Sequence, residues 1–308
     1  MSQTFSQVAA LWKEEKRQYV KKATYAVYLQ LLNGHIIPCL GEYKSVQEAD
    51  VQDFVNSMLS RGYATKTVKD TLLVFKMVIR FGSRIGAWPN INCSVHFPTE
   101  KEHGRRPAVL SIANQQKLLK YLKDNFSFKN LGILICLSTG LRIGEVCGLQ
   151  WEDMDTENGV VHVNKTVQRI YIADGEYKEY FLSIGSPKTP SALRDIPMTT
   201  ELMNIAKPLK KIINNRFYVV SNGPSPLEPR TLRHYFNKLL AKLDIPPIRF
   251  HSLRHSFATR CIESKCDYKT VSVILGHASI STTMDLYVHP GFEEKKRCIE
   301  KMARSLRR

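Results

Sequence analysis

The sequence predicts a mainly α-helical protein with a small antiparallel β-sheet, an α+β fold divided into two domains. Apolar residues recur at helical spacing through the first hundred residues and again beyond residue 111. Between Val160 and Pro197 the pattern changes to short β-rich pieces separated by turn residues. A chain of 308 residues exceeds one small core, and a polar stretch near residue 100 offers a boundary between two domains.

Residues 1–100 are expected to form a helical domain. Periodicity predicts a first helix from about Thr4 to Tyr19 and a second from about Thr24 to Asn33. The second helix is expected to end before Gly34 and Pro38, because both residue types interrupt helices.

A further helix is predicted from Val68 onward, with apolar and basic residues on different faces. The apolar stripe includes Leu72, Phe75 and Ile79. The other face carries the candidate DNA-binding residues Lys69, Lys76 and Arg80. On this segment alone, a face that contacts phosphate and a merely solvated basic face are equally well supported.

Residues 101–108 are the expected linker, and residues 109–290 the second domain. The segment TEKEHGRRP, residues 99–107, has no apolar residue and contains glycine and proline. Beyond it, Ser111 is suited to cap a helix that runs to about Lys123, and another helix is predicted from Leu131 to Ser138.

The β-rich region predicts a small antiparallel sheet inside the second domain. Its pieces are VVHV, TVQRIYI, YFLSI and LRDIP, and the turns ADGE and GSPKTPS separate them. Helices resume from Glu201, and the stretch from Arg230 to Leu243 has apolar residues on a single stripe.

The charge balance points to a polyanionic partner. The chain has 45 lysines and arginines against 28 acidic residues, a net charge of +17. Such an excess attracts phosphates without regard to sequence, although it does not distinguish DNA from RNA or an anionic membrane. No apolar run is long enough to span a bilayer, and the N-terminus lacks a signal peptide's pattern. We therefore expect no membrane partner and a cytoplasmic location.

Several common catalytic sites are missing from the sequence. There is no GxxxxGK[ST] loop, nucleophile elbow or dinucleotide fingerprint, so no nucleotide cofactor is indicated. His251 and His255 lie four residues apart, but Ser252 stands where a zinc protease needs its general-base glutamate. The seven cysteines are expected to be reduced, and Cys261 and Cys266 fit buried thiols better than a zinc site. We expect no metal and no cofactor.

Six side chains carry little meaning alone but occur in distinctive settings. They are Arg142 in TGLRIGE, Lys188 in SPKTP, His251 and Arg254 in HSLRH, His277 in LGH, and Tyr287 ten residues further on. Taken singly, an arginine next to its i+3 glutamate is usually a surface ion pair. A hairpin lysine is usually exposed, and a tyrosine usually packs.

Together and in this order, the motifs resemble the tyrosine recombinase family, also called the phage integrase family. The resemblance is strong from Val109 onward and looser over the first hundred residues, which resemble the family's helical core-binding domain. It implies a site-specific DNA recombinase that needs no ATP and no metal, with the six side chains as its active site.

The chemistry explains why these residue types would be gathered. A phosphodiester is anionic and resists attack, and a phenol with a pKa near 10 is a poor nucleophile at neutral pH. The resemblance implies that Arg142, Arg254 and His277 bind the nonbridging oxygens of the phosphate. It further implies that His251 helps to move the proton of Tyr287 and that Lys188 protonates the departing 5′-hydroxyl.

The resemblance also implies partners. It predicts double-stranded DNA and a homo-tetramer on two paired sites, with strands exchanged in pairs through a Holliday junction. Accessory DNA-bending proteins or an excision factor are further expected partners, in a bacterial, nucleoid-associated setting. Residues 291–308 predict a basic C-terminal helix with an apolar stripe, which would dock on a neighbouring protomer or pack on its own domain.

Several alternatives are open from the sequence. The hairpin PKTPSALRDIP favours integrases of phages and conjugative transposons, although these often carry an additional N-terminal arm-binding domain. A resolvase- or invertase-type recombinase is therefore a second interpretation. From other classes, a non-catalytic DNA-binding regulator and a tyrosine-type topoisomerase are the rivals. The complete series of six residues argues against the regulator, and supercoil relaxation without recombinant products would favour the topoisomerase.

Overall fold

The computed structural model describes residues 3–89, 91, 94–98, 108–187, 189–287 and 292–306. Within these ranges, the side chains of residues 285–287, 292–294 and 298 are not described. The chain divides into two compact units. Unit 1 comprises residues 1–103 and Ile170–Phe181, and unit 2 comprises Gly104–Arg169 and Leu182–Arg308. Each unit is described separately below.

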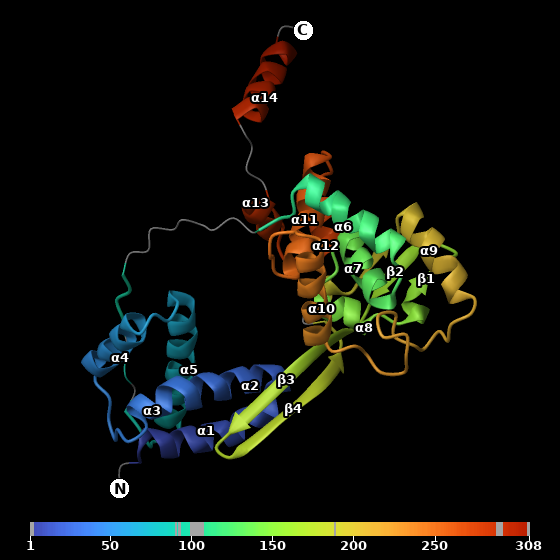
Figure 1. The fold of residues 1–308 in the computed structure, drawn as a ribbon. Helices are drawn as coiled ribbons and strands as arrows, with labels where there is room; N and C mark the ends of the chain where they lie inside the picture. Colours follow the sequence, from blue (N-terminus) through green and yellow to red (C-terminus); the bar gives the residue numbers. More distant parts are fainter. Residues whose placement is uncertain are drawn as a thin grey trace. The chain divides into compact units, whose positions relative to one another are not determined.

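Unit 1 is built mainly from helices (Figure 1). Their buried side chains form one core that includes the aromatic residues Phe5, Trp12 and Phe75. The helices are α1 (Phe5–Tyr19), α2 (Lys22–Leu31), the π-helix η1 (Leu32–Ile36), α3 (Ile37–Leu40), α4 (Glu48–Ser60) and α5 (Thr65–Arg84). The predicted start of the first helix is confirmed, because the Thr4 hydroxyl accepts from the Gln7 backbone and forms a capping box. The rings of Phe5 and Phe75 stack at 5.4 Å, which fastens α1 to α5.

The α-helix α2 ends at Leu31, before Gly34 and Pro38 as expected, but the chain unexpectedly stays helical beyond it. The helical path continues from Lys22 to Leu40, because η1 widens by one residue and the Ile37 N–H donates to the carbonyl of Leu32. Pro38 then occupies the start of α3, where a missing N–H is tolerated. Leu32 and Ile36 are completely buried, so core packing outweighs the helix-breaking residues.

One helix of unit 1 was not assigned from the sequence. Helix α4 buries four apolar residues at helical spacing, Val51, Phe54, Val55 and Met58. Its periodic pattern was therefore a usable signal.

The hairpin of β3 (Thr166–Asp174) and β4 (Tyr177–Gly185) forms a two-stranded sheet of its own. Its tip belongs to unit 1 and runs beside α1 and α2 (Figure 1). Lys13 Nζ lies 2.6 Å from the carboxylate of Asp174, and the Asn33 side chain donates to the same carboxylate at 3.1 Å. The expectation of one sheet within the second domain is therefore corrected: the β-rich region forms two sheets, and part of one packs with the N-terminal helices.

Unit 2 is a helical body with a small sheet. Its helices are α6 (Ile112–Asp124), α7 (Phe128–Thr139), α8 (Ile143–Gly148), α9 (Thr200–Lys210), α10 (Pro229–Lys242), α11 (His251–Glu263), α12 (Tyr268–Leu275), α13 (Ile280–Tyr287) and α14 (Phe292–Ser305), with short 3₁₀ turns η2 (Trp151–Asp153) and η3 (Pro190–Ala192). Strands β1 (Met154–Asp155), β2 (Val160–Val163) and β5 (Arg194–Pro197) form an antiparallel sheet in the order β1-β2-β5.

The core of unit 2 surrounds α7. Almost every residue of this helix is buried, and α6, α9, α10 and α11 pack around it. The predicted cap is confirmed, since Ser111 Oγ accepts from the Asn114 backbone at 3.2 Å. Gly140 ends α7 in the left-handed conformation, at φ +69°, and a Cβ there would lie 2.6 Å from Phe257.

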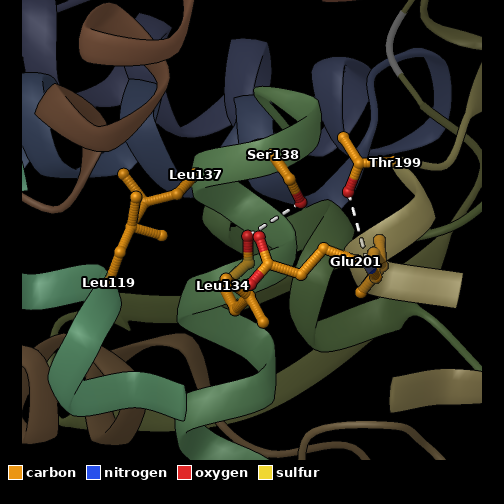
Figure 2. A pocket seen from close by; sticks show the side chains of 7 residues that line it. Leu119, Leu134, Leu137, Ser138, Thr199 and Glu201 are labelled. Atoms are coloured by element: carbon orange, nitrogen blue, oxygen red, sulfur yellow. Dashed lines mark hydrogen bonds between the residues drawn. The ribbon is translucent and has the colours of Figure 1, made fainter. Parts of the chain in front are cut away.

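A shallow pocket lies between α6, α7 and α9 (Figure 2). Its lining residues are Leu119, Leu134, Leu137, Ser138, Thr199, Glu201 and Leu202. Both hydroxyls are already used: Ser138 Oγ donates to the Leu134 carbonyl, and Thr199 Oγ1 accepts from the Leu202 N–H. The carboxylate of Glu201, which lines the pocket, pairs with Lys123. We therefore assign no chemistry to this pocket.

None of the helices in the described ranges combines the length and apolar character that crossing a membrane requires. Of the two cysteines expected to be buried thiols, Cys261 is partly buried, and Cys266 is exposed, which corrects that expectation.

Candidate active site

Arg142 stands at the turn between α7 and α8. The left-handed Gly140 reverses the chain, and Arg142 becomes the N-terminal cap of α8. Its backbone N–H and its Nη1 donate to the two oxygens of Glu145, at 2.9 and 2.8 Å. Its Nη2 donates to the carbonyl of Gly276 at 3.1 Å, so the TGLR turn and the LGH turn are joined directly.

Glu145 is not the surface partner that the sequence suggested. Its side chain is only 3% exposed, and it also accepts two hydrogen bonds from Arg194, at 2.9 and 3.2 Å. Burial raises the pKa of this carboxyl, but the hydrogen bonds and charges of Arg194 and Arg142 outweigh burial and hold the pKa below its usual value. Glu145 is therefore an ionised bridge between two arginines.

Arg194 is the site residue that the sequence analysis missed. It begins β5 and is 4% exposed, and its Nε donates to the Ile274 carbonyl at 2.6 Å. Its Nη1 also donates to the carbonyl of Ala192. Arg194 thus connects the segment that follows Lys188 to the LGH turn and to Glu145. The available signal was an arginine in the short β-rich segment LRDIP, which follows Lys188 within the same hairpin region.

Arg254 lies on the buried side of α11. Its side chain is among the largest fully buried ones, and its Nη1 donates to the carbonyl of Gly140 at 3.1 Å. A guanidinium placed there carries positive charge to the same turn that holds Arg142.

His277 follows the end of α12. Gly276 closes that helix at φ +65°, and a Cβ there would meet the Ser191 carbonyl at 2.9 Å, so only glycine fits. The backbone N–H of His277 donates to the carbonyl of Ser272. Its ring Nδ1 lies 2.8 Å from the hydroxyl of Thr283, which fixes the ring.

The imidazoles of the site are held neutral. Burial, assisted by Arg254, Arg142 and Arg194, lowers the pKa of His277 to about 4. Although His251 is exposed overall, its ring packs edge-on against His255 at 4.6 Å, and burial, His255 and Arg254 lower its pKa to about 4. The pKa of His255 is also lowered, by burial and then by Arg254. At neutral pH each ring can donate one proton or accept one.

Two predicted residues fall at the limits of what the structure describes. Lys188 lies outside the described residues, in the segment between β4 and η3. Tyr287 is the last residue of α13 and lies one turn after Thr283, and its side chain is among those not described. Their catalytic assignment stays a prediction.

The four other predicted residues gather at one place. Arg142 contacts Gly276, Arg254 contacts Gly140, and both arginines act on the rings of His251 and His277. Two guanidiniums beside two neutral imidazoles suit the binding of a tetrahedral oxyanion. Across the described ranges, no three His, Cys, Asp or Glu side chains are placed to hold a metal ion.

A groove leads away from His251 along α10. Its lining residues are Ile143, Arg233, Asn237, Pro247, Ile248, Arg249, Phe250 and His251. The apolar stripe of α10 was predicted from the sequence. Arg233 and Asn237, which lie four residues apart on another face of this helix, were not predicted as site residues. This groove offers further donors for an anionic ligand.

In unit 1, the predicted basic face of α5 is present in part. Lys69 and Arg80 are exposed, and Lys76 is half-buried. Lys69 Nζ lies over the ring of Phe97, 5.2 Å from its centroid. Arg80 lines a hollow with Lys16 and Arg84.

Comparison with known families places the chain. The model described as "Phage integrase family" matches residues 109–294, more than half of the chain. The chain belongs to the phage integrase family. A second model, "Phage integrase, N-terminal SAM-like domain", matches residues 4–59. Integrases of this family are tyrosine recombinases, a class of DNA-cleaving and DNA-joining enzymes, so the chain is an enzyme of that class.

Curated relatives include other members of this integrase family. A tyrosine recombinase XerC-like protein of Caldanaerobacter subterraneus is 25% identical over 279 residues, which cover 83% of this chain and 70% of the relative. The transposase from transposon Tn916 of Enterococcus faecalis is 28% identical over 268 residues, which cover 81% of this chain and 64% of the transposase. The chain thus spans less than two thirds of the transposase's length.

Solved integrase structures confirm the predicted fold class. The Tn1549 transposon integrase in complex with a circular intermediate DNA matches with a TM-score of 0.75 at 22% sequence identity. The match covers 98% of this chain and all of that one. The mainly helical architecture with small antiparallel sheets, a helical N-terminal part and a catalytic part, is therefore the fold of this integrase.

Proposed function

We propose that this integrase cuts and rejoins double-stranded DNA through a 3′-phosphotyrosyl bond to Tyr287. The observation that carries the proposal is the joining of the TGLR and LGH turns by Arg142, with the guanidinium of Arg254 bonded to the first of these turns. Two buried or half-buried cations at one point need an anionic ligand, and the scissile phosphate is the one that the family implies.

Each proposed role follows from the chemistry of the group. The guanidiniums of Arg142 and Arg254 bind the nonbridging oxygens and stabilise the charge that grows in the transition state. His277 donates a further hydrogen bond to this phosphate. The phenol of Tyr287 loses its proton, with His251 assisting, and attacks phosphorus. Lys188 gives a proton to the departing 5′-hydroxyl.

The new bond conserves the energy of the broken one. A phosphotyrosyl ester replaces a phosphodiester, so a 5′-hydroxyl from another strand reverses the reaction and releases the tyrosine without ATP. Strand exchange between two sites then requires four protomers on paired DNA and passes through a Holliday junction. The net charge of +17 supports binding to DNA in the nucleoid.

For the division of the chain, we propose residues 1–100 as the core-binding domain, 101–108 as the linker, 109–290 as the catalytic domain and 291–308 as a docking tail. The exposed Lys69 and Arg80 and the half-buried Lys76 of α5 support phosphate contacts by these three residues. Within unit 2, the groove lined by Arg233, Asn237 and Arg249 supports further contacts with the DNA backbone. Exposed Ile299 and Met302 on α14 support docking of the tail on a neighbouring protomer.

We further propose that the biological reaction is integration and excision of a mobile element. The similarity to a conjugative-transposon transposase, and to a transposon integrase solved with circular intermediate DNA, supports this choice. A resolvase or invertase role is the alternative, supported by similarity to a XerC-like recombinase. Accessory DNA-bending proteins or an excision factor would set the direction.

A duplex nicked a few nucleotides to the 3′ side of the scissile phosphate tests the proposal, because the short fragment with the freed 5′-hydroxyl diffuses away and traps the adduct. The DNA is selected from random sequence for binding to this chain. Wild type and Tyr19→Phe, a change at an exposed tyrosine, should form a covalent protein–DNA adduct. Tyr287→Phe should form none, and peptide mapping should locate the link at residue 287. An adduct that persists in Tyr287→Phe removes this residue from its role.

The adduct assay, together with a relaxation assay on supercoiled plasmid, separates the rival functions. Tight binding without any adduct in wild type would favour a non-catalytic DNA-binding regulator. Relaxation of supercoiled DNA without recombinant products would favour a topoisomerase.

A further inference from the structure

Thr283 has a fully buried hydroxyl one turn before the proposed nucleophile. It lies on α13, which packs against α11 and α12. Its Oγ1 is 2.8 Å from Nδ1 of His277. Among the described side chains of α13, those of Ile280 and Met284 are exposed. The bond to Thr283 thus joins α13 to the LGH turn.

The partner of Nδ1 decides what His277 can offer to a ligand. A neutral imidazole carries one N–H, and the hydrogen bond made by one nitrogen fixes the state of the other. A threonine hydroxyl that donates to Nδ1 leaves the proton on Nε2. Phosphate oxygens only accept hydrogen bonds, so this tautomer is the one that binds phosphate.

An alternative partner for the hydroxyl exists in principle. Buried threonines in helices often donate to a carbonyl one turn earlier, here that of Ser279. In the described part of α13, the Thr283 hydroxyl bonds to the ring of His277. The geometry therefore favours donation to the ring.

We propose that Thr283 is a positioning residue that orients His277 for the phosphate. This inference rests on the proposed function and adds a supporting residue to the same site. Thr283 and Tyr287 are four residues apart on one eight-residue helix. The helix that carries the proposed nucleophile therefore also carries the residue that holds the ring of His277.

Single-turnover adduct formation on the nicked duplex tests the idea with three variants. Thr283→Val keeps the shape and removes the hydroxyl, and it should slow adduct formation about tenfold. Thr283→Ser keeps the hydroxyl and should stay within about twofold of wild type. Thr282→Val makes the same change at the exposed neighbouring position and should react at the wild-type rate.

A double-mutant comparison separates positioning from packing. In a His277→Ala background, Thr283→Val should cause no further slowing, because there is no ring left to orient. Equal slowing in both backgrounds would overturn the proposal, and so would a wild-type rate for Thr283→Val.

Nitrogen NMR of histidine-labelled protein without DNA gives a readout that does not depend on activity. Wild type should show His277 protonated on Nε2, and Thr283→Val should lose this preference. A wild type that is protonated on Nδ1 would contradict the inference. If wild type formed no adduct at all, the proposed function would fail. The NMR result would still show whether the bond to Thr283 sets the tautomer of His277.

Discussion

Nη2 of Arg194 lies 2.9 Å from Oε2 of Glu145, and both side chains are almost completely buried. The same carboxylate holds Arg142 at 2.8 Å, although the arginine is 37% exposed. One buried anion therefore aligns a cation that faces outward with a cation that faces the core. Removing the inner partner leaves Glu145 poorly compensated.

Arg194→Met should destabilise the protein by about 3 kcal/mol or more, because the buried carboxylate loses its main partner. It should also slow adduct formation, because Arg142 and the LGH turn lose their common support. Chemical denaturation and the nicked-duplex assay measure the two effects. Arg169→Met, which breaks a more exposed pair with Glu228, should cost less than about 1 kcal/mol. Adding Glu145→Gln to Arg194→Met should restore part of the stability, because it removes the carboxylate charge that has lost its main partner. A further loss of stability would contradict this explanation.

Stability should fall as the pH drops from about 6.5 toward 4. The pKa of His251 and His277 is about 4 in the folded chain and about 6.5 when unfolded, so the unfolded chain binds more protons in this window. The stabilisation is complete above the unfolded pKa and is lost as pH falls to the folded value. Glu145, whose folded pKa is lowered, adds a loss at still lower pH.

Denaturation series at several pH values check this slope. His277→Gln should flatten it, whereas His234→Gln, at an exposed position on α10, should leave it unchanged. A slope that survives in His277→Gln undiminished would show that other groups cause it.

Lys69→Ala combined with Arg80→Ala should weaken DNA binding evenly across sequences. If both side chains contact phosphates, the slope of log affinity against log salt should fall by about 2. Lys117→Ala with Lys120→Ala removes the same charge from exposed positions of α6 and serves as the control. Titration of a fluorescent duplex at several salt concentrations gives both slopes. Equal slopes for the two double variants would reduce the role of α5 to general charge.

Local signals predicted much of the fold and the motif settings. Thr4 and Ser111 cap the helices that were expected to begin there, because capping depends on neighbours within three residues. The helix predicted from Leu131 to Ser138 lies within α7, which Gly140 ends. Helix α14 forms where an amphipathic tail was expected. These features depend on short stretches of sequence.

Features that depend on distant partners were not predicted. Arg194 donates hydrogen bonds to Glu145, which lies 49 residues away in the sequence. Lys13 donates to Asp174, which lies 161 residues away. The continuation of the helix through Leu32 and Ile36 depends on core burial, which overrides Gly34 and Pro38. The roles of Lys188 and Tyr287 stay predictions from the family's motifs.

The tip of the β3–β4 hairpin has a topological consequence for dividing the chain. The path forms most of unit 1, crosses into unit 2, and returns for residues 170–181 before it finishes unit 2. Cleavage between residues 104 and 169 takes Asp174 away from Lys13 and Asn33, and cleavage after residue 181 strips unit 2 of its first helices. No single break in the polypeptide therefore yields both units intact. A fragment with only the N-terminal helices has to fold while the surface around Lys13 and Asn33 lacks the hairpin tip that contacts it.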